Sequence, residues 1–409
     1  MSKTKTVLFI THGLPPESYG GVEVYINNLF NEFKKSDTFF PILLSRTNYN
    51  KFWTNLIWSD ERDPQKFYTH TPHVDIFNLT NQESDDFFKE FLINTKPDII
   101  HFEHYLHLSL SWFKIAKETL PNTKIVLTTH EYMGICPNSG QMIKTKWQNN
   151  TLCNKSSLKE CSKCFPYIPK KIISDRRKNI KLYFSYIDLF TGPSNFIKSR
   201  YVDLGIKSNK FLVSENGQHI FEHKADSNNR QQSGQLKLIY IGQINYFKGL
   251  QILLEAMEVL TNYNISLDIY GKMQDDQEYN QNILEKIKQL DNVKFHGPYS
   301  QTELPNILSL YDCLVVPSIW WENSPLVIQE AFMAKIPVIC SNIGGMAEKV
   351  TNQKNGLHFK AGDSKSLKQK ILHIYNNPTL INLFKTKIPK VKSIYDNRIE
   401  LESIYNQIA

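Results

Sequence analysis

The feature that most constrains this chain is an alternation of apolar, strand-like stretches with helical stretches, and the alternation occurs twice. Residues 22–33 illustrate the helical part, because Val22, Ile26, Leu29 and Phe33 recur at the spacing of one helix face. Strands separated by helices build a parallel sheet, since a parallel neighbour requires a crossover connection. In the first half we expect strands at 5–11, 40–45, 73–79, 98–102, 124–129 and 188–191, and a helix that begins near Ser194.

A polar stretch separates the two rounds of alternation. Residues 221–235 are rich in Asn, Gln and Ser, which is typical of a linker. After this stretch we expect strands at 237–241, 266–270, 293–296, 312–316, 337–340 and 357–359, helices at 250–260 and 325–334, and a last helix at 397–408. The chain has 409 residues, which suits two domains of ordinary size.

We therefore expect an α/β protein made of two doubly wound, Rossmann-like domains. The first comprises residues 1–218 with an insert at 136–187, and the second comprises residues 219–390. A helix within 391–409 is expected to cross back to the first domain. Open parallel sheets bind ligands at the carboxyl ends of their strands, so we expect the two sheets to face a shared cleft.

The positive charge of the chain is concentrated in the insert. The whole chain has a formal net charge of +8, and residues 136–187 carry eleven basic and two acidic side chains, a net charge of +9. Such a patch attracts an anionic partner, for which a membrane surface, a phosphorylated lipid and a nucleic acid are candidates; the alternative is a solvated basic face. Because the insert lacks paired Cys-x2-Cys knuckles, we expect no nucleic acid.

The segment 165–187 mixes basic and apolar side chains. This mixture predicts a basic amphipathic helix that can lie on an anionic membrane, and the alternative is a helix whose apolar side packs on the first domain. No run reaches the roughly 18 apolar residues of a membrane-spanning helix. The apolar stretch at 7–10 is also too short for the core of a signal peptide. We therefore expect a cytoplasmic protein that binds peripherally to the inner face of the membrane.

The strongest motif is the stretch WENSPLVIQEA at 321–331. Ser324 can cap a helix and Pro325 suits its first position, which predicts a helix start whose free amides bind phosphate. Glu322 lies in the loop before this helix, and Glu330 lies about one and a half turns into it. One carboxylate can thus reach a sugar while the other reaches ribose hydroxyls. The alternative is a capped helix with two surface glutamates.

Further marks follow a fixed order along the chain. They are Gly20-Gly21-Val22-Glu23, the stretch KPDIIH at 96–101, Thr129-His130-Glu131, Pro193-Ser194, Asn216-Gly217, Gly242 with Lys248-Gly249, and Gly344-Gly345 with Glu348. Together with the glutamate pair, these marks resemble the retaining glycosyltransferases of the two-Rossmann-domain (GT-B) type, glycosyltransferase family four, also called group 1. The resemblance covers about residues 5–375.

The resemblance implies an enzyme that transfers a sugar from a nucleotide-sugar donor and requires no cofactor or divalent metal for catalysis. The transferred group would be a hexosyl or N-acetylhexosaminyl unit, and the acceptor a saccharide or lipid-linked saccharide in surface polysaccharide assembly. Glu322 and His130 would contact the sugar, and Lys248 would neutralise the leaving diphosphate. The implied donor-binding residues are Gly20, Gly21, Gly242, Gln243, Lys248, Asn323, Ser324, Pro325, Leu326, Glu330, Gly344 and Gly345.

One residue departs from the pattern of the family. Gln243 stands where an arginine is expected just after Gly242, which removes a charge and a bidentate hydrogen-bond donor. The departure keeps open a catalytically silent partner that binds a nucleotide sugar. The same architecture also serves nucleotide-sugar epimerases, which lack this glutamate-pair context, and phosphorylases, which need a lysine-held pyridoxal cofactor and a much longer chain.

The cysteines form a second unusual pattern. Cys136, Cys153, Cys161 and Cys164 fall in the basic insert, and the last two have the spacing of a metal knuckle. A reducing cytosol disfavours disulfides. We therefore expect a structural zinc ion on these four thiols, with free or redox-active thiols and an iron–sulfur cluster as alternatives.

Overall fold

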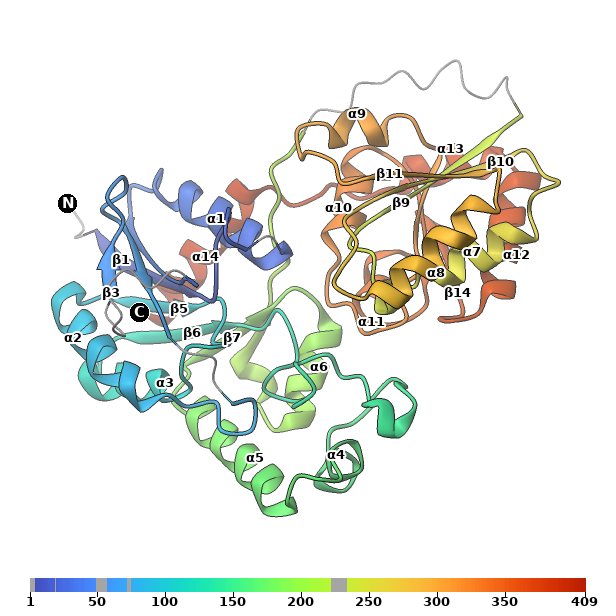
Figure 1. The fold of residues 1–409 in the computed structure, drawn as a ribbon. Helices are drawn as coiled ribbons and strands as arrows, with labels where there is room; N and C mark the ends of the chain where they lie inside the picture. Colours follow the sequence, from blue (N-terminus) through green and yellow to red (C-terminus); the bar gives the residue numbers. More distant parts are fainter. Residues whose placement is uncertain (1–3, 19, 49–56, 72–74, 222–233) are drawn as a thin grey trace. The chain divides into compact units, whose positions relative to one another are not determined.

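The chain folds into two compact units, which are described one at a time. A computed structural model describes residues 4–18, 20–48, 57–71, 75–221 and 234–409. Unit 1 comprises Met1–His219 and Lys392–Ala409, and unit 2 comprises Ile220–Val391. Figure 1 shows that each unit consists of a twisted sheet covered by helices. The two Rossmann-like domains expected from the sequence are therefore present.

Unit 1 is built on a mostly parallel sheet. In the described residues the strand order is β3-β4-β2-β1-β5-β6-β7-β8, and all neighbours are parallel except the β3–β4 pair. The strands are β1 (Lys5–Thr11), β2 (Phe39–Arg46), β3 (Ile57–Ser59), β4 (Lys66–Thr69), β5 (Ile99–Phe102), β6 (Lys124–Thr128), β7 (Leu189–Gly192) and β8 (Phe211–Val213). The chain moves outward from β1 in both directions, which is the doubly wound pattern.

Helices cover the sheet of unit 1. They are α1 (Gly21–Phe33), α2 (Asp85–Thr95), α3 (Ser111–Thr119), α4 (Leu158–Cys164), α5 (Lys170–Phe184), α6 (Asn195–Leu204) and α14 (Ile394–Ile408), with short 3-10 turns at Gln82–Ser84, Lys146–Gln148 and Ser208–Lys210. On one face, Phe9 of β1 contacts Phe33 of α1. On the other face, Phe102 of β5 contacts Phe113 of α3.

The C-terminal helix α14 belongs to unit 1, as expected. It begins with a capping box between Ser393 and Asp396, which satisfies the amides of its first turn. Tyr405 is fully buried on the face that also carries α1, with its ring 5.5 Å from that of Phe39 and 6.0 Å from that of Phe33. The last helix therefore completes the core that β1 and α1 begin.

Unit 2 is a six-stranded parallel sheet. The strand order is β11-β10-β9-β12-β13-β14, which is the 3-2-1-4-5-6 order of the Rossmann fold. The strands are β9 (Leu236–Ile241), β10 (Ile265–Tyr270), β11 (Val293–Gly297), β12 (Cys313–Val316), β13 (Val338–Ser341) and β14 (Gly356–Phe359). The helices are α7 (Leu250–Glu258), α8 (Gln277–Lys288), α9 (Leu304–Leu308), α10 (Leu326–Met333), α11 (Gly344–Lys349), α12 (Ser364–Asn376) and α13 (Thr379–Lys387), and a 3-10 turn spans Tyr246–Lys248.

The expected strand at 73–79 is wrong where the structure describes it. Residues 72–74 lie outside the described residues, and residues 75–79 form a turn. The Asp75 side chain accepts a hydrogen bond from the Phe77 amide, and the Asp75 carbonyl accepts one from the Leu79 amide. Such local bonds replace a strand ladder. The sheet edge is formed instead by β4 and β3, and the linker expected at 221–235 lies mostly outside the described residues.

No helix in the described part of the chain combines the length and the apolar character that crossing a bilayer requires.

The buried position of Tyr405 leads to a stability prediction. Tyr405→Ala would leave a cavity between α14, α1 and the sheet, and it should lower the free energy of unfolding of unit 1 by about 3–5 kcal/mol. Tyr395→Ala is the matched control, because Tyr395 lies on the same helix and is 54% exposed. Its effect should stay within about 0.5 kcal/mol. Calorimetry on both variants measures the difference, and equal losses would contradict the role given to Tyr405.

Candidate functional site

The first group of predicted residues lies at the carboxyl edge of the sheet in unit 2. Gly242 and Gln243 follow β9, Glu322 lies between β12 and α10, and Gly344 and Gly345 open α11 after β13. Because β9, β12 and β13 are neighbours in the sheet, their C-terminal loops meet at one edge.

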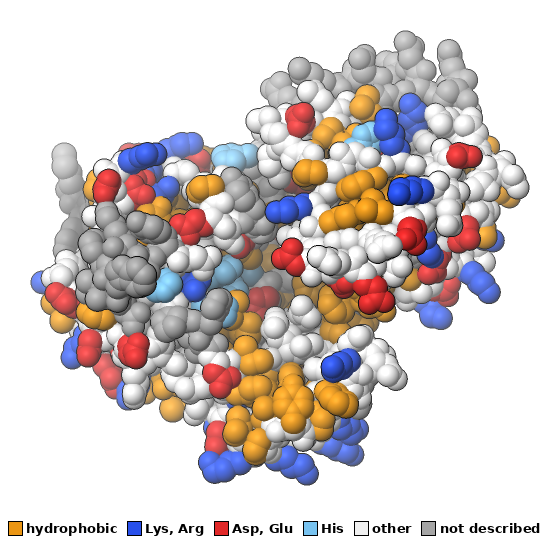
Figure 2. Space-filling model, in the orientation of Figure 1, with side chains coloured by type: hydrophobic (Ala, Val, Ile, Leu, Met, Phe, Trp, Pro, Cys, Tyr) orange, Lys and Arg blue, Asp and Glu red, His pale blue; other side chains and the backbone are white. Residues whose placement is uncertain are grey.

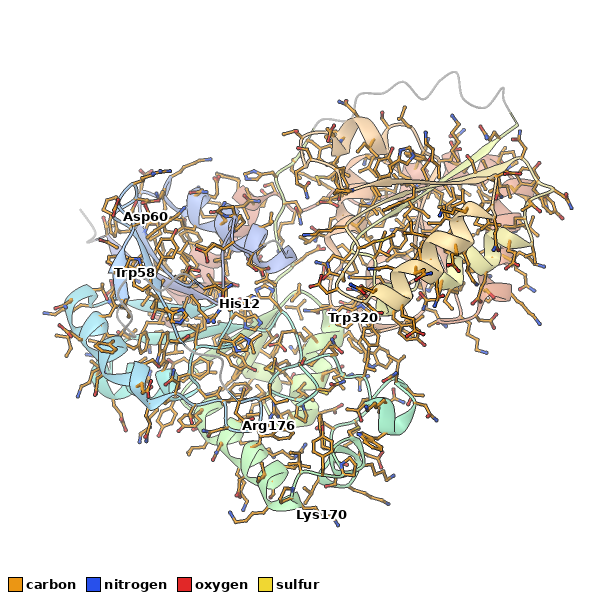
Figure 3. All side chains as sticks on the ribbon, in the orientation of Figure 1. His12, Trp58, Asp60, Lys170, Arg176 and Trp320 are labelled. Carbon is orange, nitrogen blue, oxygen red and sulfur yellow. The ribbon has the colours of Figure 1, made fainter. Side chains whose placement is uncertain are left out.

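Glu322 is the centre of a tight polar cluster. Its Oε1 accepts hydrogen bonds from Lys248 Nζ at 2.6 Å, Trp320 Nε1 at 2.8 Å and Ser318 Oγ at 2.9 Å. The Glu322 side chain is 9% exposed, whereas that of Lys248 is 26% exposed. Trp320, labelled in Figure 3, also offers its ring face to the Lys248 ammonium. The structure thus places two of the predicted catalytic residues in direct contact.

Two glycines fix the loop that carries Glu322. The Gly345 amide donates a 2.7 Å hydrogen bond to the Glu322 carbonyl. A Cβ atom at Gly345 would lie 1.5 Å from the carbonyl oxygen of Asn323, so no larger residue fits there. Gly344 has φ of +59°, a conformation that favours glycine. The pair therefore holds the loop backbone in place.

The start of α10 differs from the expectation in one respect. Pro325 occupies the N-cap position and no side chain caps the helix, so the predicted capping by Ser324 is not observed. The Ser324 hydroxyl accepts a 3.3 Å hydrogen bond from Lys349 Nζ instead. A helix start without a side-chain cap, with an ammonium beside it, retains the features that favour an anion.

Glu330 is buried one and a half turns into α10. Only 8% of the residue is exposed, and burial raises the pKa of its carboxyl group to about 7, against the lowering effect of a hydrogen bond from Gln301. The group therefore changes charge near neutral pH.

The loop after β9 carries the residue that departs from the family pattern. The Gly242 amide donates to the Tyr270 carbonyl at 3.1 Å, and the Gln243 carbonyl accepts a 3.0 Å hydrogen bond from the Tyr240 hydroxyl. These bonds fix the backbone of the loop, while the Gln243 side chain is exposed.

The second group lies at the carboxyl edge of the sheet in unit 1. Gly20 is the N-cap of α1, Gly21 is its first residue, and His130 directly follows β6 and Thr129. A Cβ atom at Gly20 would lie 2.3 Å from Glu23 Oε2. A larger residue at Gly20 would therefore have to displace the carboxylate of Glu23.

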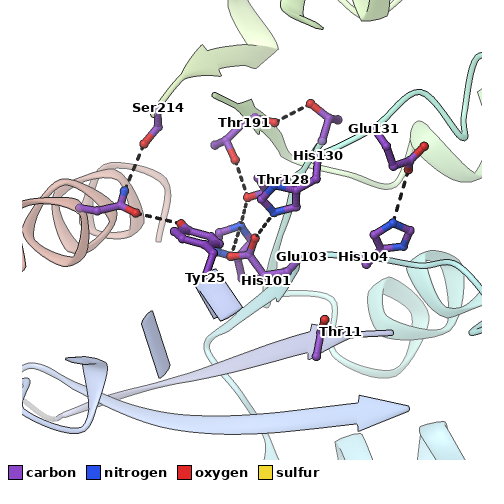
Figure 4. A network of polar contacts seen from close by, with 12 residues as sticks. Thr11, Tyr25, His101, Glu103, His104, Thr128, His130, Glu131, Thr191 and Ser214 are labelled. Atoms are coloured by element: carbon purple, nitrogen blue, oxygen red, sulfur yellow. Dashed lines mark hydrogen bonds and ion pairs between the residues drawn. The ribbon is translucent and has the colours of Figure 1, made fainter. Parts of the chain in front are cut away.

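Several glutamate carboxylates lie beside histidine rings at this edge. Glu103 Oε2 lies 2.8 Å from His130 Nε2, Glu23 lies 3.4 Å from His12, and Glu131 lies 3.8 Å from His104. Figure 4 shows the Glu103–His130 and Glu131–His104 pairs, and Figure 3 labels His12. The rings of His12 and His104 are also in contact, with centroids 4.1 Å apart.

The Glu23 carboxyl group is held in its ionised form. Burial acts to raise the pKa of Glu23, but the hydrogen bond and charge of His12 together with the Ser18 hydroxyl outweigh it and lower the pKa to about 2. Sequence reasoning missed Glu103, His12 and His104. The available signal was their position directly after the strands β1 and β5, which is where this fold collects ligand-binding residues.

The four cysteines of the insert show no metal centre. The side chains of Cys136, Cys153, Cys161 and Cys164 are buried and form no disulfide. Burial raises the pKa of the Cys136 thiol to about 12, which keeps it protonated. Among the described residues, no group of three or more His, Cys, Asp or Glu side chains is arranged to hold a metal ion. The expected zinc site therefore has no support. Cys161 and Cys164 instead pack in a small apolar core with Phe165 and Ile173.

The helix expected in the basic segment is α5, and its apolar side faces inward. Ile173, Ile180 and Phe184 are buried, as is Arg176, which donates to the carbonyls of Ile76 and Met133. The apolar side of α5 therefore packs on unit 1, and this packing is compatible with a basic outer side that lies on a membrane. Lys170 and Lys178 remain exposed.

Comparison with known proteins identifies the second unit. The sequence profile described as "Glycosyl transferases group 1" matches residues 222–391. The chain carries a group 1 glycosyltransferase domain. It is therefore classed as a glycosyltransferase, in agreement with the motifs around Glu322.

Curated relatives share part of the chain. A "41.2 kDa protein in cps region" of Klebsiella pneumoniae is 26% identical over 257 residues, which cover 59% of this chain and 67% of that protein. The capsular polysaccharide biosynthesis glycosyltransferase CapM of Staphylococcus aureus is 26% identical over 211 residues, which cover 49% of this chain and 52% of CapM.

Solved structures of glycosyltransferases share the fold of the whole chain. A glycosyltransferase from Rickettsia africae superposes with a TM-score of 0.71 at 18% identity, covering 99% of this chain and 98% of its own. HepE from Anabaena, in complex with UDP and glucose, superposes with a TM-score of 0.67 at 14% identity, and the match covers 98% of this chain and 100% of HepE. At these identities the likeness establishes the GT-B fold alone.

The raised pKa of Glu330 leads to a prediction about stability and pH. A carboxyl group with a folded pKa of about 7 and an ordinary value of 4.5 favours folding when protonated, and this contribution is lost as the pH rises through 7. At pH about 8, Glu330→Gln should therefore stabilise unit 2 by up to about 3 kcal/mol relative to wild type. Near pH 4.5 the variant and wild type should differ little in stability. Thermal unfolding at both pH values measures this. The exposed Glu285→Gln serves as control, and a pH-independent difference for Glu330→Gln would contradict the prediction.

Proposed function

We propose that the chain is a retaining, metal-independent glycosyltransferase that moves a hexosyl or N-acetylhexosaminyl group from a nucleotide-sugar donor to a saccharide or lipid-linked saccharide acceptor in surface polysaccharide biosynthesis. The observation that carries the proposal is the Lys248–Glu322 ion pair beside the uncapped start of α10. An ammonium and a set of helix amides at one sheet edge suit a diphosphate, and a carboxylate beside them suits a sugar.

The proposed reaction needs stabilisation of the leaving diphosphate. The bond between the anomeric carbon and the diphosphate oxygen breaks, a bond to the acceptor oxygen forms, and the acceptor proton passes to the leaving phosphate. Negative charge develops on the diphosphate, where Lys248 and the amides of residues 323–326 would meet it. The fixed positive charge of Lys248 replaces the role of a metal ion. Departure and attack on the same face of the sugar would retain the anomeric configuration.

The other predicted donor contacts follow from their positions. Glu330 would accept hydrogen bonds from the ribose hydroxyls, for which its ionised form is the better acceptor. Gly242, Gln243 and the Gly344-Gly345 pair would shape the backbone around the diphosphate, and Gly20, Gly21 and His130 would act from unit 1. HepE has been solved in complex with UDP and glucose, and CapM is a glycosyltransferase of capsular polysaccharide biosynthesis, which supports the proposed donor class and pathway.

A single experiment tests the donor and the role of Glu322. Wild type should be stabilised against heat by one of the UDP-, GDP-, ADP- or TDP-linked sugars without added metal. Glu322→Gln should keep the donor affinity within about threefold, because Lys248 remains, while turnover should fall by about 100-fold. Glu258→Gln, an exposed carboxylate on α7, is the control and should behave as wild type.

The outcome separates two functions. Binding with unchanged turnover in Glu322→Gln would remove the catalytic role of this residue. Donor binding by wild type without any turnover would favour the catalytically silent partner, for which the uncharged Gln243 is the supporting observation. No binding to any of these donors would contradict both functions.

We also infer that the basic insert holds the enzyme at an anionic membrane as a peripheral cytoplasmic protein. Exposed apolar side chains accompany its lysines: Tyr167 is 66% exposed, Trp147 55%, Leu182 53% and Ile172 43%. Figure 2 shows hydrophobic side chains beside Lys and Arg side chains over the region of α4 and α5. Aromatic and basic residues together suit a lipid headgroup region, which would bring the enzyme to a lipid-linked acceptor.

Vesicle co-sedimentation tests the membrane proposal. The protein should bind vesicles with about a third phosphatidylglycerol and not pure phosphatidylcholine, and replacing both Lys170 and Lys178 by Gln should weaken binding about 30-fold, at about 1 kcal/mol per lysine. The control replaces Lys365 and Lys387 of unit 2 by Gln, which removes the same charge elsewhere. Equal losses in both double variants, or binding to neutral vesicles, would contradict a surface on the insert.

A further inference from the structure

We propose that Glu103 is a positioning residue for His130, which it holds in the tautomer that carries hydrogen on Nε2. In that tautomer Nδ1 is the nitrogen that accepts hydrogen bonds. His130 would then recognise a sugar hydroxyl, which can donate, rather than a phosphate oxygen, which cannot. This role rests on the proposed function, because it concerns how His130 meets the transferred sugar.

The contact between the two residues is short and shielded from solvent. Glu103 Oε2 lies 2.8 Å from His130 Nε2, and the exposed fractions of the two side chains are 0% and 2%. A carboxylate can only accept at this contact, so Nε2 must donate. Burial acts to raise the pKa of Glu103, but the neighbouring His101 and His130 with the Thr128 hydroxyl outweigh it and lower the pKa.

The groups packed around the pair keep Glu103 in place. From β5, His101 lies with Nε2 3.5 Å from Glu103 Oε1, and burial lowers the pKa of His101, which favours its neutral form. His101 Nε2 contacts the Thr128 hydroxyl of β6 at 2.6 Å, and His101 Nδ1 contacts the Tyr405 hydroxyl of α14 at 2.5 Å. His101 is therefore anchored on both sides.

The remaining neighbours come from α1 and from the loop after β5. The Tyr25 ring of α1 lies edge-on to the His130 ring, with centroids 5.7 Å apart, and its hydroxyl donates to Asn397 Oδ1 at 2.9 Å. Burial raises the pKa of both Tyr25 and Tyr405, which keeps these phenols neutral. Burial also lowers the pKa of His104. Figure 4 shows that the network surrounds the pair from α14 to β6.

The position of the pair argues for a role beyond stability. A buried carboxylate–imidazole pair adds little stability compared with apolar residues of the same volume, because both groups lose their hydration. Glu103 directly follows β5 and His130 follows β6 and Thr129, at the sheet edge where this fold binds ligands. A costly polar pair at that edge is typical of a functional site.

The variant Glu103→Gln tests the proposal, because the amide has the same shape but no charge and can turn its NH2 group toward His130. Turnover should fall about tenfold or more while the donor KM stays within about twofold, and the pH profile of turnover should shift. Asp98→Asn is the matched control. Asp98 precedes the same strand at its opposite end, where it accepts a 2.7 Å hydrogen bond from the Thr6 amide, so this variant should show the wild-type rate and profile.

Nitrogen-15 NMR of the histidine rings provides a readout that requires no turnover. In wild type, the His130 signals, assigned with His130→Gln, should report hydrogen on Nε2, and Glu103→Gln should alter that pattern. A wild-type ring with hydrogen only on Nδ1, or a variant with unchanged rate and pH profile, would overturn the proposal. If wild type transfers no sugar but shows the Nε2–H tautomer, the proposed function fails while the positioning of His130 stands.

Discussion

Parallel strand pairing is the constraint on which the rest of the structure depends. In a parallel sheet every strand ends at the same edge, so residues far apart in sequence become neighbours simply by following a strand. Lys248 and Glu322 meet in this way after β9 and β12, and Glu103 and His130 meet after β5 and β6. The helices provide the crossovers and bury the two faces, which leaves the edge as the place where polar groups can gather.

Burial and hydrogen-bond partners together determine the charge of these polar groups. The Glu322 carboxylate is shielded from water but accepts hydrogen bonds from the Lys248 ammonium and two further donors. Glu330 has one amide partner, and the pKa of its carboxyl group is about 7. In unit 1, the hydrogen-bond partners of Glu23 lower the pKa of its carboxyl group to about 2. Carboxylates on one fold thus differ in charge at neutral pH because their hydrogen-bond partners differ, and not because their burial differs greatly.

The sequence predicted the parts of the fold that depend on local pattern. β1 was placed at its observed bounds, and the strands of unit 2 were all found, because buried parallel strands are continuous apolar runs. The short strands β3, β4 and β8 were not assigned residue ranges, because runs of three or four residues are too short to show a strand pattern. The turn at 75–79 was mistaken for a strand because the side chain of Asp75, which closes it, does not interrupt the apolar spacing.

The candidate site was predictable where a motif has fixed spacing and not where it depends on tertiary contact. Glu322 and Glu330 belong to one motif, but nothing local links Lys248 to Glu322 or Glu103 to His130. Glu103 is a single glutamate after a strand, a signal that many surface residues share. Likewise, the sequence could not tell which side of α5 faces the protein, because both sides carry apolar residues.

The position of α14 has a consequence for how the chain folds during synthesis. Unit 2 is continuous in sequence and can bury its whole core once Val391 has left the ribosome. Unit 1 is synthesised first but cannot enclose Phe33 and Phe39 until Tyr405 arrives. Unit 1, whose larger part precedes unit 2, is therefore the unit that finishes folding last, with an apolar face and the polar network around Glu103 exposed to water in the interval.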